Sequence, residues 1–251
     1  AHEALDTVQP YSCEMLKFLP SLIKQDLHLE NWSLENIRLL KGGESPPLFL
    51  IISSDRGLCG GYNTNLIKAL RQHIDKLPDF RIAAVGKKGI HLIQQTIWKD
   101  KILSLPLTEN TSYHTSARLI ETLEESLNKG LIGSIKCLHY TYKNILSQKL
   151  ELTSLVPFSC DLSNFKKEDM LIEPQVDILL PKLLRDYLTI QFHAILLESH
   201  VCEQASRMTA MDNATRNARD ILLRLESTYN KTRQSQITNQ LIEIISAAQA
   251  V

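Results

Sequence analysis

The sequence lacks an excess of charge of either sign. Of its 251 residues, 28 are Lys or Arg and 28 are Asp or Glu, so the formal net charge is zero. Because no net positive field surrounds the chain, we expect no nucleic-acid partner, and any contact with an acidic surface must be local. Apolar side chains make up 43% of the residues, enough for one large or two small folded units, which argues against a mainly disordered protein.

The sequence also lacks long apolar runs and paired cysteines. No stretch approaches the ~18 apolar residues of a membrane span, and the start of the sequence has neither the basic nor the apolar part of a signal peptide. We therefore expect no direct membrane insertion. The cysteines are scattered and form no CxxC pair, which argues against a disulfide framework and a zinc site and favours a reducing compartment. They are Cys13, Cys59, Cys137, Cys160 and Cys202.

Glycine and proline are both absent from residues 182–251. A run of this length without a helix breaker predicts one long helix. Its apolar residues recur at steps of three, four and seven, which predicts a coiled coil with a partner helix. The same pattern is compatible with several shorter bundle helices joined by polar loops. The recurring residues are Leu197, Val201, Met208, Met211, Ala218, Leu222, Leu225 and Tyr229.

The start of the sequence offers a partner for this helix. Steps of three and four connect Leu5, Val8, Ser12, Met15, Leu19 and Leu22. About 22 helical residues span only ~33 Å, whereas the C-terminal run would span ~105 Å. We therefore expect either further residues before Ala1 or other subunits to cover the rest of the apolar stripe.

Between the helical ends, strand patterns alternate with helix patterns. The predicted strands are 47–55, 81–86, 134–142 and 149–156, with a short strand near Ile102, and the predicted helices are 63–76, 89–97 and 111–129. This order predicts a small three-layer, Rossmann-like α/β domain inserted between N- and C-terminal helices that form an antiparallel coiled coil. The expected divisions are an N-terminal coiled-coil helix and linker at 1–45, the α/β domain at 46–174 and the long C-terminal coiled-coil helix at 175–251.

The glycine-rich sequence SDRGLCGGYN, residues 54–63, follows a predicted strand and precedes a predicted helix. A phosphate-binding loop occupies that place in nucleotide-binding folds. However, Gly57, Gly60 and Gly61 match neither GxxxxGK[ST] nor GxGxxG. The spacing favours a tight strand-to-helix turn with Asn63 as a helix cap. We expect Cys59 in this turn to be a buried, inert thiol.

No other pattern indicates catalysis. His193 and His200 are seven residues apart with Glu198 nearby, but no HExxH motif is present to hold zinc, and we expect both to be surface or seam histidines. The sequence contains no GxSxG elbow either. We therefore expect no enzyme activity, no metal and no cofactor.

The C-terminal end is poor in charge, since Glu243 is the only charged residue from 234 to 251. A free terminus normally frays in water, so this apolar, periodic end is typical of one that is enclosed by partners. Just before it, Lys231 and Arg233 form a cationic collar suited to meet carboxylates. The alternative is a helix folded back onto its own domain.

Several long stretches resemble the gamma subunit of F-type ATP synthases, the central rotor shaft of that complex. AHEALDTVQPY at 1–11 resembles the later part of the family's N-terminal helix, whose first several dozen residues, rich in Lys and Met, are missing from this sequence. The other matching stretches are SDRGLCGGYNTN at 54–65, ASRMTAMDNATRNA at 205–218, YNKTRQSQIT at 229–238 and LIEIISAA at 241–248.

The resemblance implies a non-catalytic rotor subunit without a cofactor. In the family, the terminal helices form a coiled coil inside a ring of alpha and beta subunits, while the α/β domain sits on the c-ring and binds the epsilon-type subunit. Proton flow turns the ring, and the shaft drives each beta subunit through its nucleotide-binding states. The implied location is peripheral, on the cytoplasmic face of a bacterial inner membrane or the matrix face of the mitochondrial inner membrane.

Residue by residue, the resemblance implies that Arg233, Gln234 and Thr238 meet a loop of the beta subunit. It also implies that Glu173 and Pro174 face the c-ring. Two readings from other classes stay open. One is an α/β nucleotide-binding enzyme with a helical oligomerisation tail, which ATP or NAD binding by the isolated chain would favour. The other is a coiled-coil scaffold that does not copurify with an alpha–beta hexamer.

Overall fold

The structure is a computed structural model that describes residues 34–105, 112–145, 147–158 and 176–249. The chain divides into two compact units, the first ending at Arg207 and the second beginning at Met208. Because the N-terminal segment 1–33 and the segment 159–175 lie outside the described residues, the predicted N-terminal helix and the residues Glu173 and Pro174 have no structural account here.

The first unit is built on a mixed four-stranded sheet with the order β2-β1-β3-β4. The central strand β1 pairs in parallel with β2 and with β3, and β3 pairs antiparallel with β4 at the edge. The strands are β1 at Pro47–Ile52, β2 at Arg81–Val85, β3 at Ser134–Tyr142 and β4 at Gln148–Val156. All four strands were predicted from the sequence.

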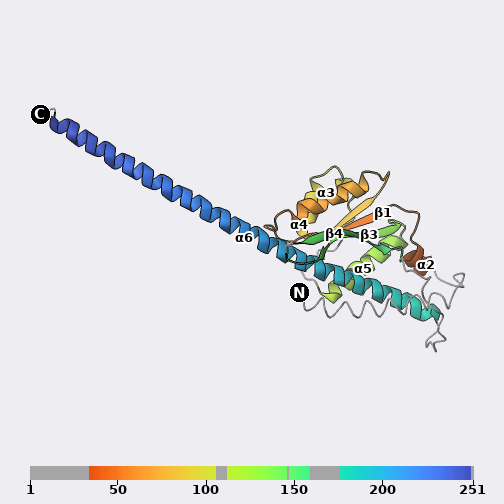
Figure 1. Ribbon diagram of the computed structural model, residues 1–251. Coiled ribbons are helices and arrows are strands. Elements are labelled where there is room, and N and C mark those ends of the chain that lie inside the picture. The colour runs from red at the N-terminus through yellow and green to blue at the C-terminus, as the bar shows by residue number, and fades with distance from the viewer. Residues whose placement is uncertain (1–33, 106–111, 146, 159–175, 250–251) are drawn as a thin grey trace. The chain divides into compact units, whose positions relative to one another are not determined.

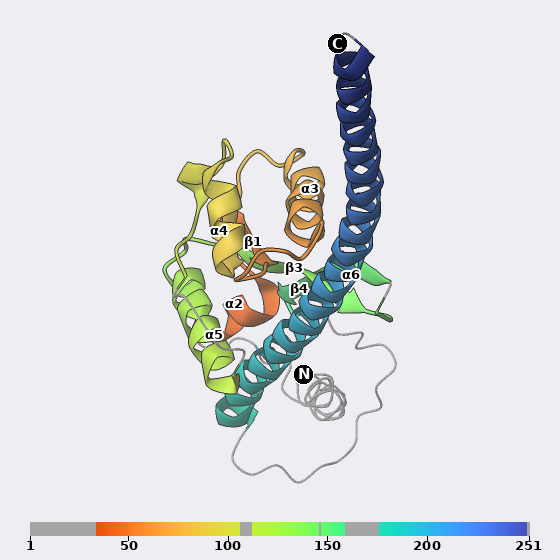
Figure 2. The same ribbon diagram turned by 90° about the vertical axis from the view of Figure 1, so that its left-hand side faces the viewer.

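Five helices of four or more residues, including the first part of a long one, accompany the sheet in the described part of this unit (Figures 1 and 2). Figure 2 shows α3 and α4 on one side of the strands and α5 on the other. The helices are α2 at Leu34–Lys41, α3 at Tyr62–Ile74, α4 at Lys87–Gln94, α5 at Tyr113–Asn128 and α6 at Val176–Gln249, and a 3-10 turn, η2, covers Lys99–Lys101.

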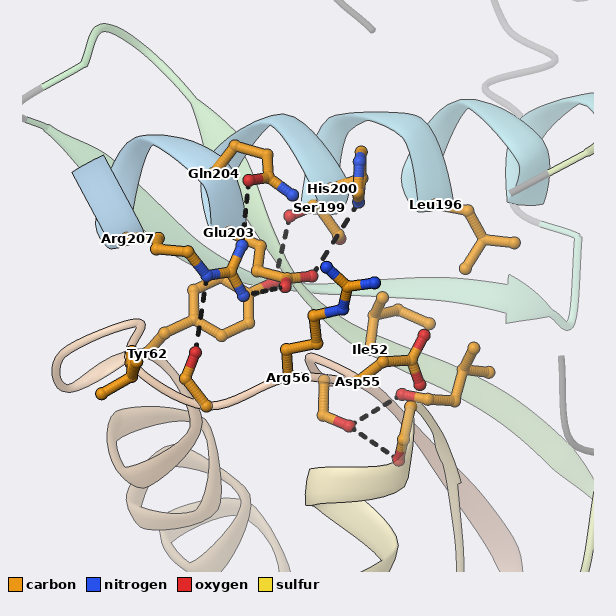
Figure 3. A pocket seen from close by; sticks show the side chains of 15 residues that line it. Ile52, Asp55, Arg56, Tyr62, Leu196, Ser199, His200, Glu203, Gln204 and Arg207 are labelled. Carbon is orange, nitrogen blue, oxygen red and sulfur yellow. Dashed lines mark hydrogen bonds and ion pairs between the residues drawn. The ribbon is translucent and has the colours of Figure 1, made fainter. Parts of the chain in front are cut away.

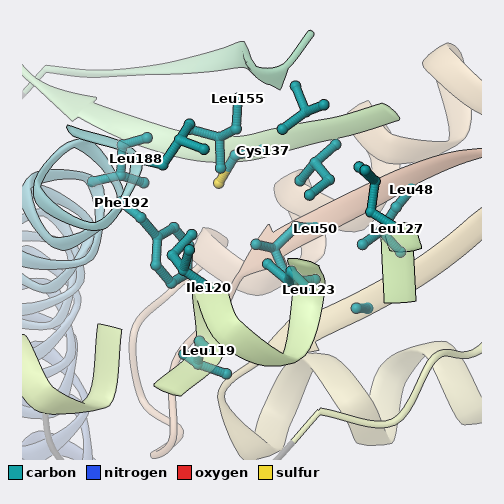
Figure 4. Packing of buried hydrophobic residues seen from close by; sticks show 14 of the residues in the cluster. Leu48, Leu50, Leu119, Ile120, Leu123, Leu127, Cys137, Leu155, Leu188 and Phe192 are labelled. Carbon is teal, nitrogen blue, oxygen red and sulfur yellow. The ribbon is translucent and has the colours of Figure 1, made fainter. Parts of the chain in front are cut away.

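Alternate residues of the central strands point to two hydrophobic clusters. Leu48 and Leu50 of β1 belong to the cluster formed with α5 and α6, whereas Phe49 and Ile51 belong to the cluster formed with α3 and α4. Because β1 is buried on both faces, its sequence PLFLII reads as a continuous apolar run. Figure 4 shows Phe192 of α6 packed beside Ile120 of α5 in the first cluster.

Three details differ from the sequence prediction. Helix α2 at Leu34–Lys41 was not predicted, since this stretch was assigned to the N-terminal helix and linker. The predicted strand near Ile102 is only an isolated parallel bridge between Ile82 and Ile102. Helix α4 begins at Lys87, directly after Gly86, and ends at Gln94, so the predicted 89–97 is displaced toward the C-terminus. The displacement arises because Thr96 turns back, its N–H donating to the carbonyl of Ile93.

Helix α6 contains 74 residues and continues from the first unit into the second, as the absence of glycine and proline predicted. Its first part presents buried residues to the sheet at helical spacing, among them Leu188, Phe192, Ile195 and Cys202. The second unit is the rest of this helix, and its described side chains lie largely in solvent. Within the residues that the structure describes, no helix has the length and apolarity needed to cross a membrane.

Candidate functional site

The glycine-rich loop after β1 is built to satisfy the start of α4. The carboxylate of Asp55 accepts from the N–H of Lys87 at 3.0 Å, and the hydroxyl of Ser53 accepts from the N–H of Gly89 at 2.9 Å. The carbonyl of Ser54 accepts from the N–H of Lys88 at 3.1 Å. The loop after β1 thus occupies three N–H donors at the start of α4, the helix that follows the neighbouring strand β2.

The side chains of Asn63 and Ser54 hold the inside of the loop, and the Ser54 hydroxyl donates to the carbonyl of Arg56 at 2.7 Å. The Asn63 amide accepts from the N–H of Ser54 at 3.1 Å and donates to the Ser54 hydroxyl at 2.7 Å and the Cys59 sulfur at 3.3 Å. Asn63 was expected to cap α3, but the residue at the cap position is Gly61 and no side chain caps the helix. Asn63 therefore sits in the first turn of α3 and folds back to brace the loop.

These contacts leave Leu58 at the tip of the loop. Leu58 has a φ of 63° and is 75% exposed, an unusual combination because a left-handed backbone is costly for residues other than glycine. Next to it Cys59 is buried, as predicted, with 3% exposure. The loop thus turns one apolar side chain outward and one thiol inward.

A cleft of about 660 Å³ lies between this loop and residues 196–207 of α6. In Figure 3, Arg207 and Glu203 of α6 face the loop beside Tyr62. Arg207 pairs with the Glu203 carboxylate and donates from Nε to the carbonyl of Gly57 at 3.4 Å. His200 also lines the cleft, its Nδ1 atom 3.9 Å from Glu203. The charges of both signs in the cleft are therefore largely balanced.

The two histidines singled out in the sequence contact different parts of the first unit. His193 contacts the Ser116 hydroxyl of α5 through Nδ1 at 3.1 Å, and burial lowers its pKa. His200 lines the cleft instead. Glu198 accepts from the N–H of Tyr142 at 2.9 Å and has its pKa raised by burial. Among the described residues, no group of three or more His, Cys, Asp or Glu side chains has the arrangement of a metal site.

The second unit is a helix with an exposed apolar stripe. We call this stripe the seam; its exposed members are Met208, Met211, Leu222, Leu225 and Tyr229, between 38% and 67% exposed. Apolar side chains of this size in one row are typical of a surface that a partner covers. Further along, Ile237, Leu241, Ile244 and Ile245 form a terminal apolar patch, also exposed.

The seam changes direction at the cationic collar. Alternating steps of three and four keep an apolar row nearly in line, but Tyr229, Arg233 and Ile237 are separated by two successive steps of four. Eight residues advance the row by about 80° around a helix of 3.6 residues per turn. The seam and the terminal patch therefore face different directions, and Arg233 lies where one gives way to the other.

The collar region offers cations but few free hydroxyl donors. Arg233, Gln234 and Thr238 are all exposed. The Thr238 hydroxyl donates to the carbonyl of Gln234 at 2.8 Å, and Thr232 donates in the same way to Thr228 at 2.9 Å. The protons of these two threonines are thus used within the helix, whereas the charged and amide groups of the collar are exposed to a partner.

Comparison with known proteins decides the family. The model of a family described as ATP synthase matches residues 1–251. A protein of Pelagibacter ubique named ATP synthase gamma chain is 32% identical over 262 residues, which cover 100% of this chain and 88% of that protein. The protein of the same name from Granulibacter bethesdensis is 33% identical over 267 residues, covering 100% and 89%. The chain belongs to the ATP synthase gamma-chain family.

Solved structures show the same fold. A chain in the Euglena gracilis mitochondrial ATP synthase OSCP/F1/c-ring structure has a TM-score of 0.66 at 21% identity, covering 99% of this chain and 92% of that one. A chain in the rotor structure of the same synthase has a TM-score of 0.62 at 20% identity, covering 94% and 97%. The mixed sheet and long helix are therefore a gamma-chain fold.

Within this gamma chain, the residues singled out in the sequence fall in separate places. Arg233, Gln234 and Thr238 share one short stretch of the second unit, whereas the glycine-rich loop belongs to the first. Sequence reasoning missed the roles of Arg207 and Ser206, which contact that loop. Both lie in the family-like stretch 205–218, which was the available signal, but nothing in a linear sequence pairs them with residues 57 and 59.

Proposed function

We propose that this gamma chain is the central-stalk rotor subunit of an F-type, proton-translocating ATP synthase. It couples rotation of the c-ring to conformational changes in the catalytic beta subunits. The observation that carries the proposal is the exposed seam and terminal patch of the second unit. In water, so many exposed leucines and isoleucines on one helix are unfavourable, and partners that enclose the helix remove that cost.

The seam is the proposed contact within an antiparallel coiled coil. Its partner is the N-terminal helix, in the division 1–45, and the helical division 175–251 supplies the other strand. The division 46–174 is then an inserted, Rossmann-like α/β domain. Heptad spacing from 208 to 229 supports this pairing, as does the family membership of the chain.

The cationic collar and the residues after it form the proposed contact with the catalytic hexamer. Arg233, Gln234 and Thr238 meet a loop of the beta subunit, and alpha and beta subunits enclose the terminal patch. The turn of the apolar row at Arg233 supports a change of partner there, because one straight helix cannot cover both faces. An arginine fork at this point suits a carboxylate-bearing loop.

The opposite end of the chain carries the proposed contacts with the rest of the rotor. The c-ring meets the region of Glu173 and Pro174, and the epsilon-type subunit binds the α/β domain. The chain is then a peripheral part of a membrane-associated complex, on the cytoplasmic face of a bacterial inner membrane or the matrix face of the mitochondrial one.

In this role the chain needs no catalytic residue or cofactor. A rotating asymmetric shaft makes different contacts with each beta subunit, and only such differential contacts can shift a conformational equilibrium. ATP chemistry belongs to the beta subunits.

The proposal is tested with a double variant, Arg233→Gln with Gln234→Ala, in the complete synthase reconstituted in vesicles. We expect ATP-driven proton pumping to fall relative to ATP hydrolysis, because the contact that ties rotation to the beta subunit is weakened. The matched control is Arg219→Gln, an exposed arginine two heptads earlier on the same helix. Unchanged pumping and synthesis in the double variant, or an equal loss in the control, would count against the proposed contact.

A further inference from the structure

Helix α6 is joined to the sheet by a closed circuit of hydrogen bonds near the end of the first unit. The Tyr140 hydroxyl of β3 donates to the carbonyl of Tyr62 at 3.1 Å, and the Tyr62 hydroxyl donates to the carbonyl of Ser199 on α6 at 3.2 Å. One turn further along α6, the Cys202 thiol donates to the carbonyl of Tyr140 at 3.7 Å. Three elements, β3, α3 and α6, are thus linked in a ring.

The ring is buried and fixed in its protonation state. Tyr62, Tyr140, Ser199 and Cys202 are between 0% and 7% exposed, and the two tyrosine rings stack with centroids 4.4 Å apart. Burial raises the pKa of Tyr140 to about 12 and that of Tyr62 well above its usual value. Both hydroxyls therefore stay protonated and keep donating throughout the physiological pH range.

Two further bonds extend the ring to the glycine-rich loop. The Ser206 hydroxyl donates to the carbonyl of Cys59 at 2.9 Å, and Arg207 donates to the carbonyl of Gly57. These residues are the last of the first unit. We call the three-bond ring and these two bonds together the polar anchor.

The anchor differs in kind from the packing around it. Apolar contacts of α6, through residues such as Leu188 and Phe192, are non-directional. Hydrogen bonds weaken steeply when their angle or length departs from the optimum. The anchor therefore adds an orientation-dependent restraint on the rotation of α6 about its own axis, together with the bonds that His193 and Glu198 make to α5 and β3.

We infer that the polar anchor is the joint through which torque passes between the α/β domain and α6, with Tyr62 and Ser206 as its positioning residues. This inference rests on the proposed rotor function, because torque must then travel along α6, the covalent connection between the two units. Four of the five bonds reach α6, between Ser199 and Arg207, just before the helix leaves the first unit, and the fifth joins β3 to α3. They hold the helix at the place where a twisting load would first turn it.

The test uses the complete synthase carrying Tyr62→Phe, Ser206→Ala or both. Each change deletes one hydroxyl, and loss of one hydrogen bond raises the population of the disengaged joint by about two- to tenfold. The matched control is Thr189→Val, because the buried Thr189 hydroxyl donates only to Arg185 of the same helix, at 2.9 Å. Its loss removes no bond between elements.

Two readouts separate a torque joint from a merely structural role. With the c-ring held, the angular fluctuation of the shaft in single complexes should widen in the double variant. Proton pumping against an opposing gradient should fall, while ATP hydrolysis without a gradient stays at the wild-type rate. Thr189→Val should change neither readout.

Each outcome is decisive. Wild-type fluctuation and pumping in the double variant overturn the inference, as does an equal change in the control. If the double variant does not assemble, Ser206→Ala alone decides, since it leaves the buried ring intact: a wider fluctuation supports the joint and an unchanged one overturns it. If the wild-type complex neither rotates nor pumps, the proposed function fails, and the inference fails with it.

Discussion

Two neighbouring leucines of α6 allow a sharp test of the seam. Leu222 lies in the heptad row, whereas Leu223 is turned by about 100° around the helix. Their exposed fractions are 56% and 62%, so this chain by itself buries the two side chains to almost the same extent. We compare Leu222→Gln with Leu223→Gln, because glutamine has nearly the same helix propensity as leucine and leaves the helix itself undisturbed.

The expected difference follows from what a partner helix would bury. Full burial of a leucine contributes about 1.5–3 kcal/mol, and with half of Leu222 still exposed, about 1–2 kcal/mol of this remains to be gained from a partner. An amide placed in that interface without a hydrogen-bond partner costs about 1–3 kcal/mol more. Together, Leu222→Gln should weaken the pairing by about 2–5 kcal/mol, against about 0.5 kcal/mol for Leu223→Gln.

The assay measures how much gamma chain stays bound in the assembled complex after dilution and gel filtration. We expect Leu222→Gln to release the chain at dilutions that leave wild type and Leu223→Gln bound. Circular dichroism of each isolated chain should be unchanged, which confirms that the helix is intact. Equal loss from both variants, or none from either, would contradict a heptad seam with one partner helix.

Three further predictions concern the first unit. Gly86→Ala should destabilise it by about 2–4 kcal/mol in urea unfolding, because Gly86 has a φ of 102° and an added Cβ would lie 2.3 Å from the Ser53 carbonyl; Gly57→Ala, whose Cβ would meet nothing nearer than 3.9 Å, should be near neutral. Asn63→Ala should cost about 2–3 kcal/mol, since three loop hydrogen bonds are lost, whereas the same unfolding midpoint in wild type and variant would show that the loop is held otherwise. Burial lowers the pKa of His139 below its usual 6.5, so the unfolded chain takes up the proton more readily and stability is lost as pH falls through about 6.5; His139→Gln should shrink the difference between unfolding midpoints measured at about pH 7.5 and 5.5, and an undiminished difference would assign the effect to other groups.

The regular elements were predictable because each has a periodic signal of its own. The run PLFLII, the alternation in β3 and β4, and the absence of glycine and proline after residue 182 all act locally, so a linear pattern contains them. The predicted bounds of the short helix α4 were displaced because its limits depend on Gly86 and Thr96, which act through contacts with Ser53 and Ile93. The contacts of Arg233, Gln234 and Thr238 with a beta subunit stay predictions.

The contacts around the glycine-rich loop could not be predicted from the sequence, for a different reason. Ser206 and Cys59 are 147 positions apart, and Tyr62 and Ser199 are 137 apart. In each pair one partner is a backbone carbonyl, which every residue possesses. The side chain involved therefore leaves no recognisable companion in the sequence, and only the folded chain reveals the bond.

The glycine-rich loop contacts two helices besides α3, the helix that directly follows it. Its side chains turn toward α4 and occupy the donors there, as Asp55 and Ser53 do. Its carbonyls at Gly57 and Cys59 turn toward α6, where Ser206 and Arg207 donate to them. Toward α6 the loop therefore presents carbonyl acceptors. The loop thus links α4 to α6, and the carbonyls that it turns toward α6 suit the attachment of that helix.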